Sequence, residues 1–148
     1  MSLPRLYTVA RLALGVIFLV ASLDKIMHPQ AFSEMIYNYQ LLPDRVINLA
    51  ALVLPWMELV LGLLLILGRA LPGSVVLSNL LLLAFFGALM FNLARGLNIH
   101  CGCFSTDPSG DPATWWYVTR DSGFLVLGGY LFLKTILLKQ APAARIAK

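Results

Sequence analysis

Residues 54–68 read LPWMELVLGLLLILG, an apolar run interrupted by one carboxylate, Glu58. A hydrocarbon core about 30 Å thick is crossed by about 20 helical residues, each of which rises about 1.5 Å. Extended toward the amino terminus, the run fills a segment of this length, about residues 46–67. The stretch therefore predicts a membrane-spanning helix that carries a charge into the membrane.

The composition of the whole chain points to the same class of protein. Hydrophobic residues make up 59% of the 148 residues and charged residues 12%, whereas a soluble domain carries about a quarter charged residues. We expect an all-α integral membrane four-helix bundle that forms a single domain over residues 1–148. The other three spans are expected at about residues 5–27, 73–97 and 112–138, with outer loops at 28–45 and 98–111.

The first outer loop has a helical pattern of its own. Phe32, Met35, Ile36 and Tyr39 recur at the spacing of one helix face, and Pro43 ends the pattern. Such a stripe is typical of a helix that lies in the membrane interface. We therefore expect a short interfacial helix between helices one and two.

The charges predict an orientation. The amino terminus, the loop at Arg69 and the carboxyl-terminal tail contain basic residues and no acid: Arg5, Arg11, Arg69, Lys134, Lys139, Arg145 and Lys148. By the positive-inside rule, both termini are cytoplasmic and the two longer loops face outward. The net charge of +4 is thus a topology signal, and no patch indicates nucleic acid.

Both cysteines lie in the second outer loop. Residues 98–110 read NIHCGCFSTDPSG, so that Cys101 and Cys103 directly follow His100. Cα atoms at this spacing lie about 5.5–7 Å apart, at the edge of the range that a disulfide spans. A bond between them would be strained and readily reduced. We expect a redox-active disulfide on the oxidising side of the membrane, with His100 or Arg95 favouring the thiolate.

Ionisable residues within the apolar segments form a second group of candidates, because each is costly there and by default marks a functional or tightly paired site. A site beneath the thiols would use the cofactor-binding candidates Lys25, Arg95, Arg120, Asp121, Trp116 and Glu58. The alternative for the outer charges is an ion pair of Lys25 or Arg95 with Asp121 that only ties helices together. For Glu58, the alternative to a proton or quinone role is a structural contact with Asn79 or Arg11.

The order RLALGVIFLVASLDKIMHPQAF, YQLLP, PWMELVLGLLLILG, CGCF and TRD resembles the DoxX/MauE family of small four-helix membrane proteins, in its redox-associated MauE-like branch, over about residues 5–138. The resemblance implies thiol or sulfur redox chemistry at the periplasmic face of the bacterial inner membrane. MauE-type members are associated with methylamine utilisation and the maturation of a disulfide-rich dehydrogenase, and DoxX-type members with quinone-coupled sulfur oxidation. Ser105 stands where glycine usually follows the phenylalanine of the cysteine motif.

Together these features predict a quinone-linked thiol–disulfide oxidoreductase. Electrons would pass from a periplasmic client's thiols through Cys101 and Cys103 to a quinone or a redox partner. Because the chain has one cysteine pair, the client's thiolate would attack Cys101 or Cys103 directly. The protein could act alone, as a homo-oligomer or within a membrane complex.

Two other functions use the same residues. His100, Cys101 and Cys103, with His28, offer nitrogen and sulfur ligands that suit copper or zinc, as in a metal-binding or transport module. Alternatively, the cysteine pair is a structural staple in a subunit of a redox complex. Neither alternative requires redox turnover.

The charge distribution makes a prediction about topology. A membrane-impermeant thiol reagent applied to intact cells after mild reduction should label Cys103, because the positive-inside rule puts the second loop outside. Labelling only after lysis, with a permeant reagent showing that the thiols are reactive, would contradict this orientation.

Overall fold

The structure is a computed structural model that describes residues 3–96 and 114–137. Every regular element in these ranges is helical: α1 Leu3–Met27, α2 Pro29–Tyr39, α3 Asp44–Leu67, α4 Leu71–Ala94, α5 Thr114–Phe132 and the π-helix η1 Leu133–Leu137. The predicted all-α class is confirmed.

Three of the described helices are long and apolar enough to cross a membrane: Arg5–Met27, Asp44–Leu67 and Leu71–Ala94. Over the described part of the chain, the 19-residue α5 is not among them. The structure therefore supports three of the four predicted spans by length and composition.

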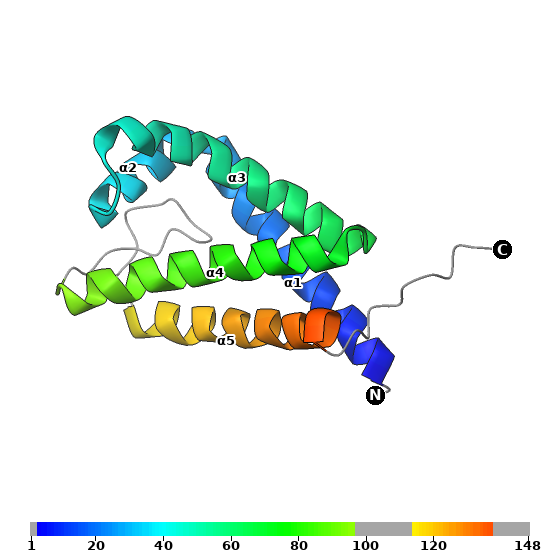
Figure 1. The fold of residues 1–148 in the computed structure, drawn as a ribbon. Coiled ribbons are helices and arrows are strands. Elements are labelled where there is room, and N and C mark those ends of the chain that lie inside the picture. The colour runs from blue at the N-terminus through cyan, green and yellow to red at the C-terminus, as the bar shows by residue number, and fades with distance from the viewer. Residues whose placement is uncertain (1–2, 97–113, 138–148) are drawn as a thin grey trace.

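The described helices have two distinct ends (Figure 1). The start of α1, the turn between α3 and α4, and the end of α5 lie together at one end. The end of α4 and the start of α5 lie at the other, together with α2, which packs mainly against α3. Hereafter, the second group is called the α2 end. Phe32 and Met35, two residues of the predicted interfacial stripe, lie on the buried face of α2.

Two glycines allow α1 and α3 to approach each other closely. A Cβ atom added to Gly15 would lie 2.7 Å from Cγ1 of Ile66, and one added to Gly62 would lie 2.9 Å from the Gly15 carbonyl oxygen. Helices in lipid associate through van der Waals packing of this kind, because lipid tails are as apolar as the side chains they replace. The α1–α3 contact is the most extensive helix pair among the described elements.

At the end opposite the α2 end, α3 ends at Leu67 and is followed by Gly68, whose φ of 70° is left-handed. The Arg69 N–H donates to the Leu64 carbonyl at 3.0 Å across this turn. A side chain at Gly68 would collide with the Arg11 guanidinium, so the cation of Arg11 lies at the negative end of the α3 dipole. The Arg11 guanidinium therefore lies against the turn that follows α3 and is not the partner of Glu58, which pairs with Lys25.

Asn79 joins α4 to α5. Its Nδ2 donates to the Val75 carbonyl at 2.8 Å and to the Gly128 carbonyl at 3.1 Å. A Cβ atom at Gly128 would lie 2.8 Å from the Asn79 Oδ1, so the glycine is what allows this close approach. Asn79 therefore has a structural role between α4 and α5, away from Glu58.

The glycine packing makes a prediction about stability. Gly15→Ala and Gly62→Ala should each lower the thermal stability of the detergent-solubilised protein, because overpacking a close contact costs about 1–3 kcal/mol. The matched controls are Gly87→Ala and Gly123→Ala, where an added Cβ meets nothing within 4 Å. These should be neutral or stabilising by up to about 1 kcal/mol, since alanine favours the helix. Equal effects at all four positions would contradict the predicted close packing.

Candidate functional site

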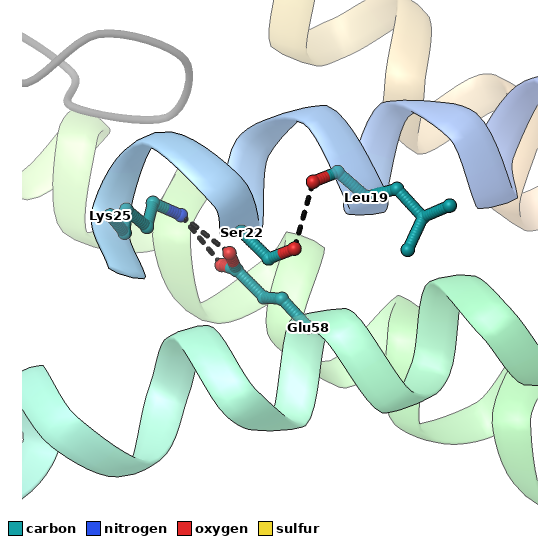
Figure 2. A network of polar contacts seen from close by, with 4 residues as sticks. All are labelled: Leu19, Ser22, Lys25 and Glu58. Carbon is teal, nitrogen blue, oxygen red and sulfur yellow. Dashed lines mark hydrogen bonds and ion pairs between the residues drawn. The ribbon is translucent and has the colours of Figure 1, made fainter. Parts of the chain in front are cut away.

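A buried ion pair joins α1 to α3 near the α2 end (Figure 2). The Nζ atom of Lys25 lies 2.7 Å from Oε1 of Glu58 and 2.8 Å from Oε2. Lys25 is 2% exposed and Glu58 3% exposed. The neighbouring Ser22 hydroxyl donates instead to the Leu19 carbonyl at 2.8 Å. Both carboxylate oxygens of Glu58 therefore accept a hydrogen bond from the same ammonium group.

The two charges meet because α1 and α3 are not aligned end to end. Lys25 lies in the last turn of α1, whereas Glu58 lies in the middle of α3. The amino-terminal half of α3, which begins at Asp44, therefore extends beyond the end of α1. Glu58 therefore belongs to the α2 end. The structural contact that we considered for Glu58, with Asn79 or Arg11, is replaced by a contact with Lys25.

Aromatic rings surround the ammonium group of Lys25. Its Nζ atom lies 5.2 Å from the ring centroid of Phe32 and 4.9 Å from that of Phe85. A cation over the face of an aromatic ring is stabilised most strongly where water is excluded. Phe32 of α2, Glu58 of α3 and Phe85 of α4 thus all contact the ammonium group of Lys25 on α1.

A second ion pair lies on α5. Arg120 donates through Nε to Oδ1 of Asp121 at 2.9 Å, and its Nη2 lies 2.9 Å from the same oxygen. The Arg120 guanidinium also lies 5.2 Å from the ring centroid of Tyr117 and 5.8 Å from that of Phe124. Because Arg120 and Asp121 are adjacent on one helix, this contact does not tie helices together. We call Lys25, Glu58, Arg120 and Asp121 the polar cluster.

A small cavity lies between the two ion pairs. Its volume is about 40 Å³. The charged residues that line it are Lys25 and Asp121, and its remaining walls are Ile17, Phe18, Ala21, Leu82, Phe85, Phe86 and Phe124. One charged residue from each pair therefore faces the same apolar enclosure.

Asn92 is a buried polar residue that sequence reasoning did not select as a site candidate. It is 1% exposed, and within the described residues neither its Oδ1 nor its Nδ2 has a hydrogen-bond partner. Phe85, Leu89 and Asn92 follow one another at helical spacing, so Asn92 lies on the face of α4 that meets Lys25, about two turns farther out. This spacing is the signal that could have identified it.

Tyr39, at the end of α2, lies within electrostatic range of Asp121 and Arg120. Burial raises the pKa of the half-buried Tyr39 phenol, and the negative charge of Asp121 raises it further. The phenol therefore stays protonated at neutral pH and keeps its ability to donate a hydrogen bond.

The other candidates within the described ranges are exposed. Nη2 of Arg95 donates to Oε1 of Gln40 at 3.1 Å, which connects the end of α4 to the end of α2. Trp116 is 65% exposed on α5. His28 is exposed, and its Nδ1 lies 3.6 Å from Oδ1 of Asp24. The structure does not bring Arg95, Trp116 or His28 into the buried contacts of the polar cluster.

The catalytic candidates His100, Cys101 and Cys103 lie outside the described residues. The same is true of most of the alternative metal-ligand set. Within residues 3–96 and 114–137, no group of three or more His, Cys, Asp or Glu side chains could hold a metal ion.

A second, larger pocket lies between α3 and α4. Its volume is about 620 Å³, within the range of about 300–1,000 Å³ that is typical of small-molecule sites. It is lined by Leu52, Val53, Trp56, Met57, Val60, Leu61, Leu64, Ala70, Gly73, Ser74 and Leu77. Its lining is almost wholly apolar, so it suits an apolar ligand.

Several apolar helices with a buried polar cluster define a multi-pass membrane protein. The chain belongs to the MauE family: the family described as methylamine utilisation protein MauE matches residues 3–134. The chain is 33% identical over 142 residues to the methylamine utilization protein MauE of Paracoccus denitrificans, covering 95% of this chain and 75% of that protein. It is 32% identical over 142 residues to the protein of the same name from Methylorubrum extorquens, covering 95% and 74%. No solved structure matches.

The Lys25–Glu58 pair makes a prediction about stability. Lys25→Met and Glu58→Met should each destabilise the protein by about 3–5 kcal/mol, because each change leaves one buried charge uncompensated. The double variant should recover most of the lost stability, since no buried charge then remains. Thermal unfolding in detergent measures both effects, with the exposed Arg45→Met as a control. A double variant as unstable as the sum of the single variants would show that the two charges are not coupled.

Proposed function

We propose that this protein is a thiol–disulfide oxidoreductase that acts at the periplasmic face of its membrane. It would oxidise client thiols in methylamine-utilisation-type protein maturation. The name of the two relatives, methylamine utilization protein MauE, links them to methylamine utilisation. The observation that carries the proposal is the buried polar cluster near the α2 end. Lys25, Glu58 and Asp121 are buried there, and charges held inside a membrane protein mark a functional site by default.

The position of the cysteines in the chain supports this proposal. The segment that carries them joins Gly96, two residues after α4, to Thr114, the first residue of α5. The end of α4 and the start of α5 both lie at the α2 end, so this segment begins and ends at the end of the molecule that contains the polar cluster.

The proposed reaction is thiol–disulfide exchange. A client thiolate attacks one sulfur of the Cys101–Cys103 disulfide and forms a mixed disulfide, and the client's second thiolate then displaces that sulfur. The client leaves with a disulfide, and Cys101 and Cys103 leave the exchange as two thiols. Two electrons and two protons have thus passed from the client to the cysteine pair, and both must leave again before the next turnover.

The membrane arrangement that we propose is a single-domain four-helix bundle. In it, α5 is the fourth span, because α5 packs against α4 and α1 and η1 extends it to Leu137. α2 lies in the outer interface. Both termini face the cytoplasm, and the membrane is the bacterial inner membrane, as the basic residues near the termini favour.

A quinone is the electron acceptor that we propose, but the polar cluster has no room for its ring. The cavity between Lys25 and Asp121 measures about 40 Å³, which suits one water and not a ring. The pocket between α3 and α4 has an apolar lining, but Ala70, Gly73 and Ser74 border it beside the turn between α3 and α4, at the end opposite the α2 end. A quinone that takes electrons directly from the cysteine pair would therefore bind beside Cys101 and Cys103, outside both described cavities. The quinone would supply two-electron oxidation.

The proposed redox role makes a prediction about the cysteines. Cys101→Ser and Cys103→Ser should each abolish client oxidation in native membranes, because either change removes the disulfide. The bundle should remain folded, since so small a ring contributes little loop-closure stability. In Cys101→Ser, the remaining Cys103 thiolate can attack the disulfide of an oxidised client, and the mixed disulfide that forms should accumulate on non-reducing gels because no neighbouring thiol resolves it. Ser105→Ala is the control within the same segment. Activity retained in both cysteine variants would refute the redox proposal, and loss of stoichiometric copper or zinc in both would favour the metal alternative.

A further inference from the structure

The cavity between the two ion pairs has the dimensions and the chemistry of a water site. A cavity needs roughly 10–15 Å³ of probe-occupied volume, and at least two polar partners, to hold a water. Its volume is about 40 Å³, and Lys25 and Asp121 face it from α1 and α5. Purely apolar cavities stay dry, but this one has a cation on one side and an anion on the other.

The hydrogen-bonding groups of Lys25 and Asp121 can also accommodate one water. An ammonium group has three N–H donors, and Lys25 uses two of them on Oε1 and Oε2 of Glu58. The third N–H is available to an acceptor beside the rings of Phe32 and Phe85. Oδ1 of Asp121 accepts a hydrogen bond from Nε of Arg120, and a carboxylate has about four lone-pair sites in all. A water between Lys25 and Asp121 would accept from the first and donate to the second.

We propose that one buried water bridges Lys25 and Asp121, so that Glu58, Lys25, the water and Asp121 form a single hydrogen-bonded proton-exchange site across α3, α1 and α5. The site links the two ion pairs. Its ligand class is the proton, carried by water.

The proton-exchange role rests on the proposed thiol chemistry. Each client disulfide releases two protons when the cysteine pair is oxidised again, and a quinone that takes the two electrons takes two protons as well. The titratable groups that face the site are Lys25 from α1, Tyr39 from α2, Glu58 from α3, and Arg120 and Asp121 from α5. The described face of α4 contributes Phe85 and the amide of Asn92, which do not titrate. Among the described residues, one carboxylate therefore lies on each side of Lys25, Glu58 on α3 and Asp121 on α5.

The water can be tested without any assay of activity. An experimental structure that resolves ordered waters should contain a peak within hydrogen-bonding distance of both the Lys25 Nζ and an Asp121 oxygen. A clear map in which this cavity is empty would overturn the proposal.

Filling the cavity gives a second test, whose sign depends on whether the cavity is wet. Ala21 lines the cavity, and Ala21→Val would occupy it with methyl groups. Displacing an ordered water with a group that cannot replace its hydrogen bonds is unfavourable, so Tm should fall below that of Ala13→Val, the same change at an exposed position of α1. An Ala21→Val variant as stable as the control, or more stable, would indicate a dry cavity and overturn the proposal.

The proton-exchange role is tested by the rate at which the cysteine pair is oxidised again in native membranes. Asp121→Asn and Ala21→Val should slow this step by roughly tenfold or more, in the range of general acid–base effects. Ala21→Val, which changes no residue of the polar cluster, should leave formation of the mixed disulfide with the client unchanged. If the cysteine pair is oxidised again in both variants as fast as in Ala13→Val, proton exchange is refuted and the thiol proposal stays intact. Cysteine variants that keep full activity would instead refute the thiol proposal, and the water would still be decided by the map and by Tm.

Discussion

The structure depends on one interaction, the ion pair of Lys25 and Glu58 inside a membrane protein. Moving two charges out of water costs several kcal/mol for each ion, and their mutual attraction repays this only with close geometry. The geometry is close, with both carboxylate oxygens within 2.8 Å of the ammonium. Apolar residues of similar volume would often hold α1 and α3 together equally well or better. Stability alone therefore does not account for the pair, which is the physical reason to assign it a function.

The rest of the fold keeps this pair dry and oriented. Gly15 and Gly62 bring α1 and α3 into backbone contact, which sets the offset that aligns Lys25 with Glu58. Phe32 on α2 and Phe85 on α4 enclose the ammonium group. Asp121 on α5 faces the same cavity as Lys25, so each of the five α-helices contributes a residue to this end of the molecule. The same end receives the cysteine segment, because that segment joins α4 to α5.

The sequence predicted the helical class and the polar residues better than it predicted their partners. Apolar runs long enough to span a membrane revealed α1, α3 and α4, and the spacing of Phe32 and Met35 revealed α2. The partner of Glu58 was not predicted: Asn79 and Arg11 were considered, whereas the offset between α1 and α3 brings Lys25 to Glu58. A partner from another helix was considered for Asp121, but its adjacent Arg120 pairs with it. Asn92 was not selected, although it follows Phe85 and Leu89 at helical spacing.

The central claim is that the polar cluster serves a redox-active cysteine pair. The most direct measurement is the redox state of Cys101 and Cys103 in native membranes, trapped by acid and read from the mass added by an alkylating reagent with and without prior reduction. In the unaltered protein the account predicts a mixture of oxidised and reduced pairs. In Lys25→Met/Glu58→Met it predicts accumulation of the reduced pair, because the site that removes protons is lost. An identical redox distribution in both proteins, or thiols that react only after a chelator is added, would contradict the account.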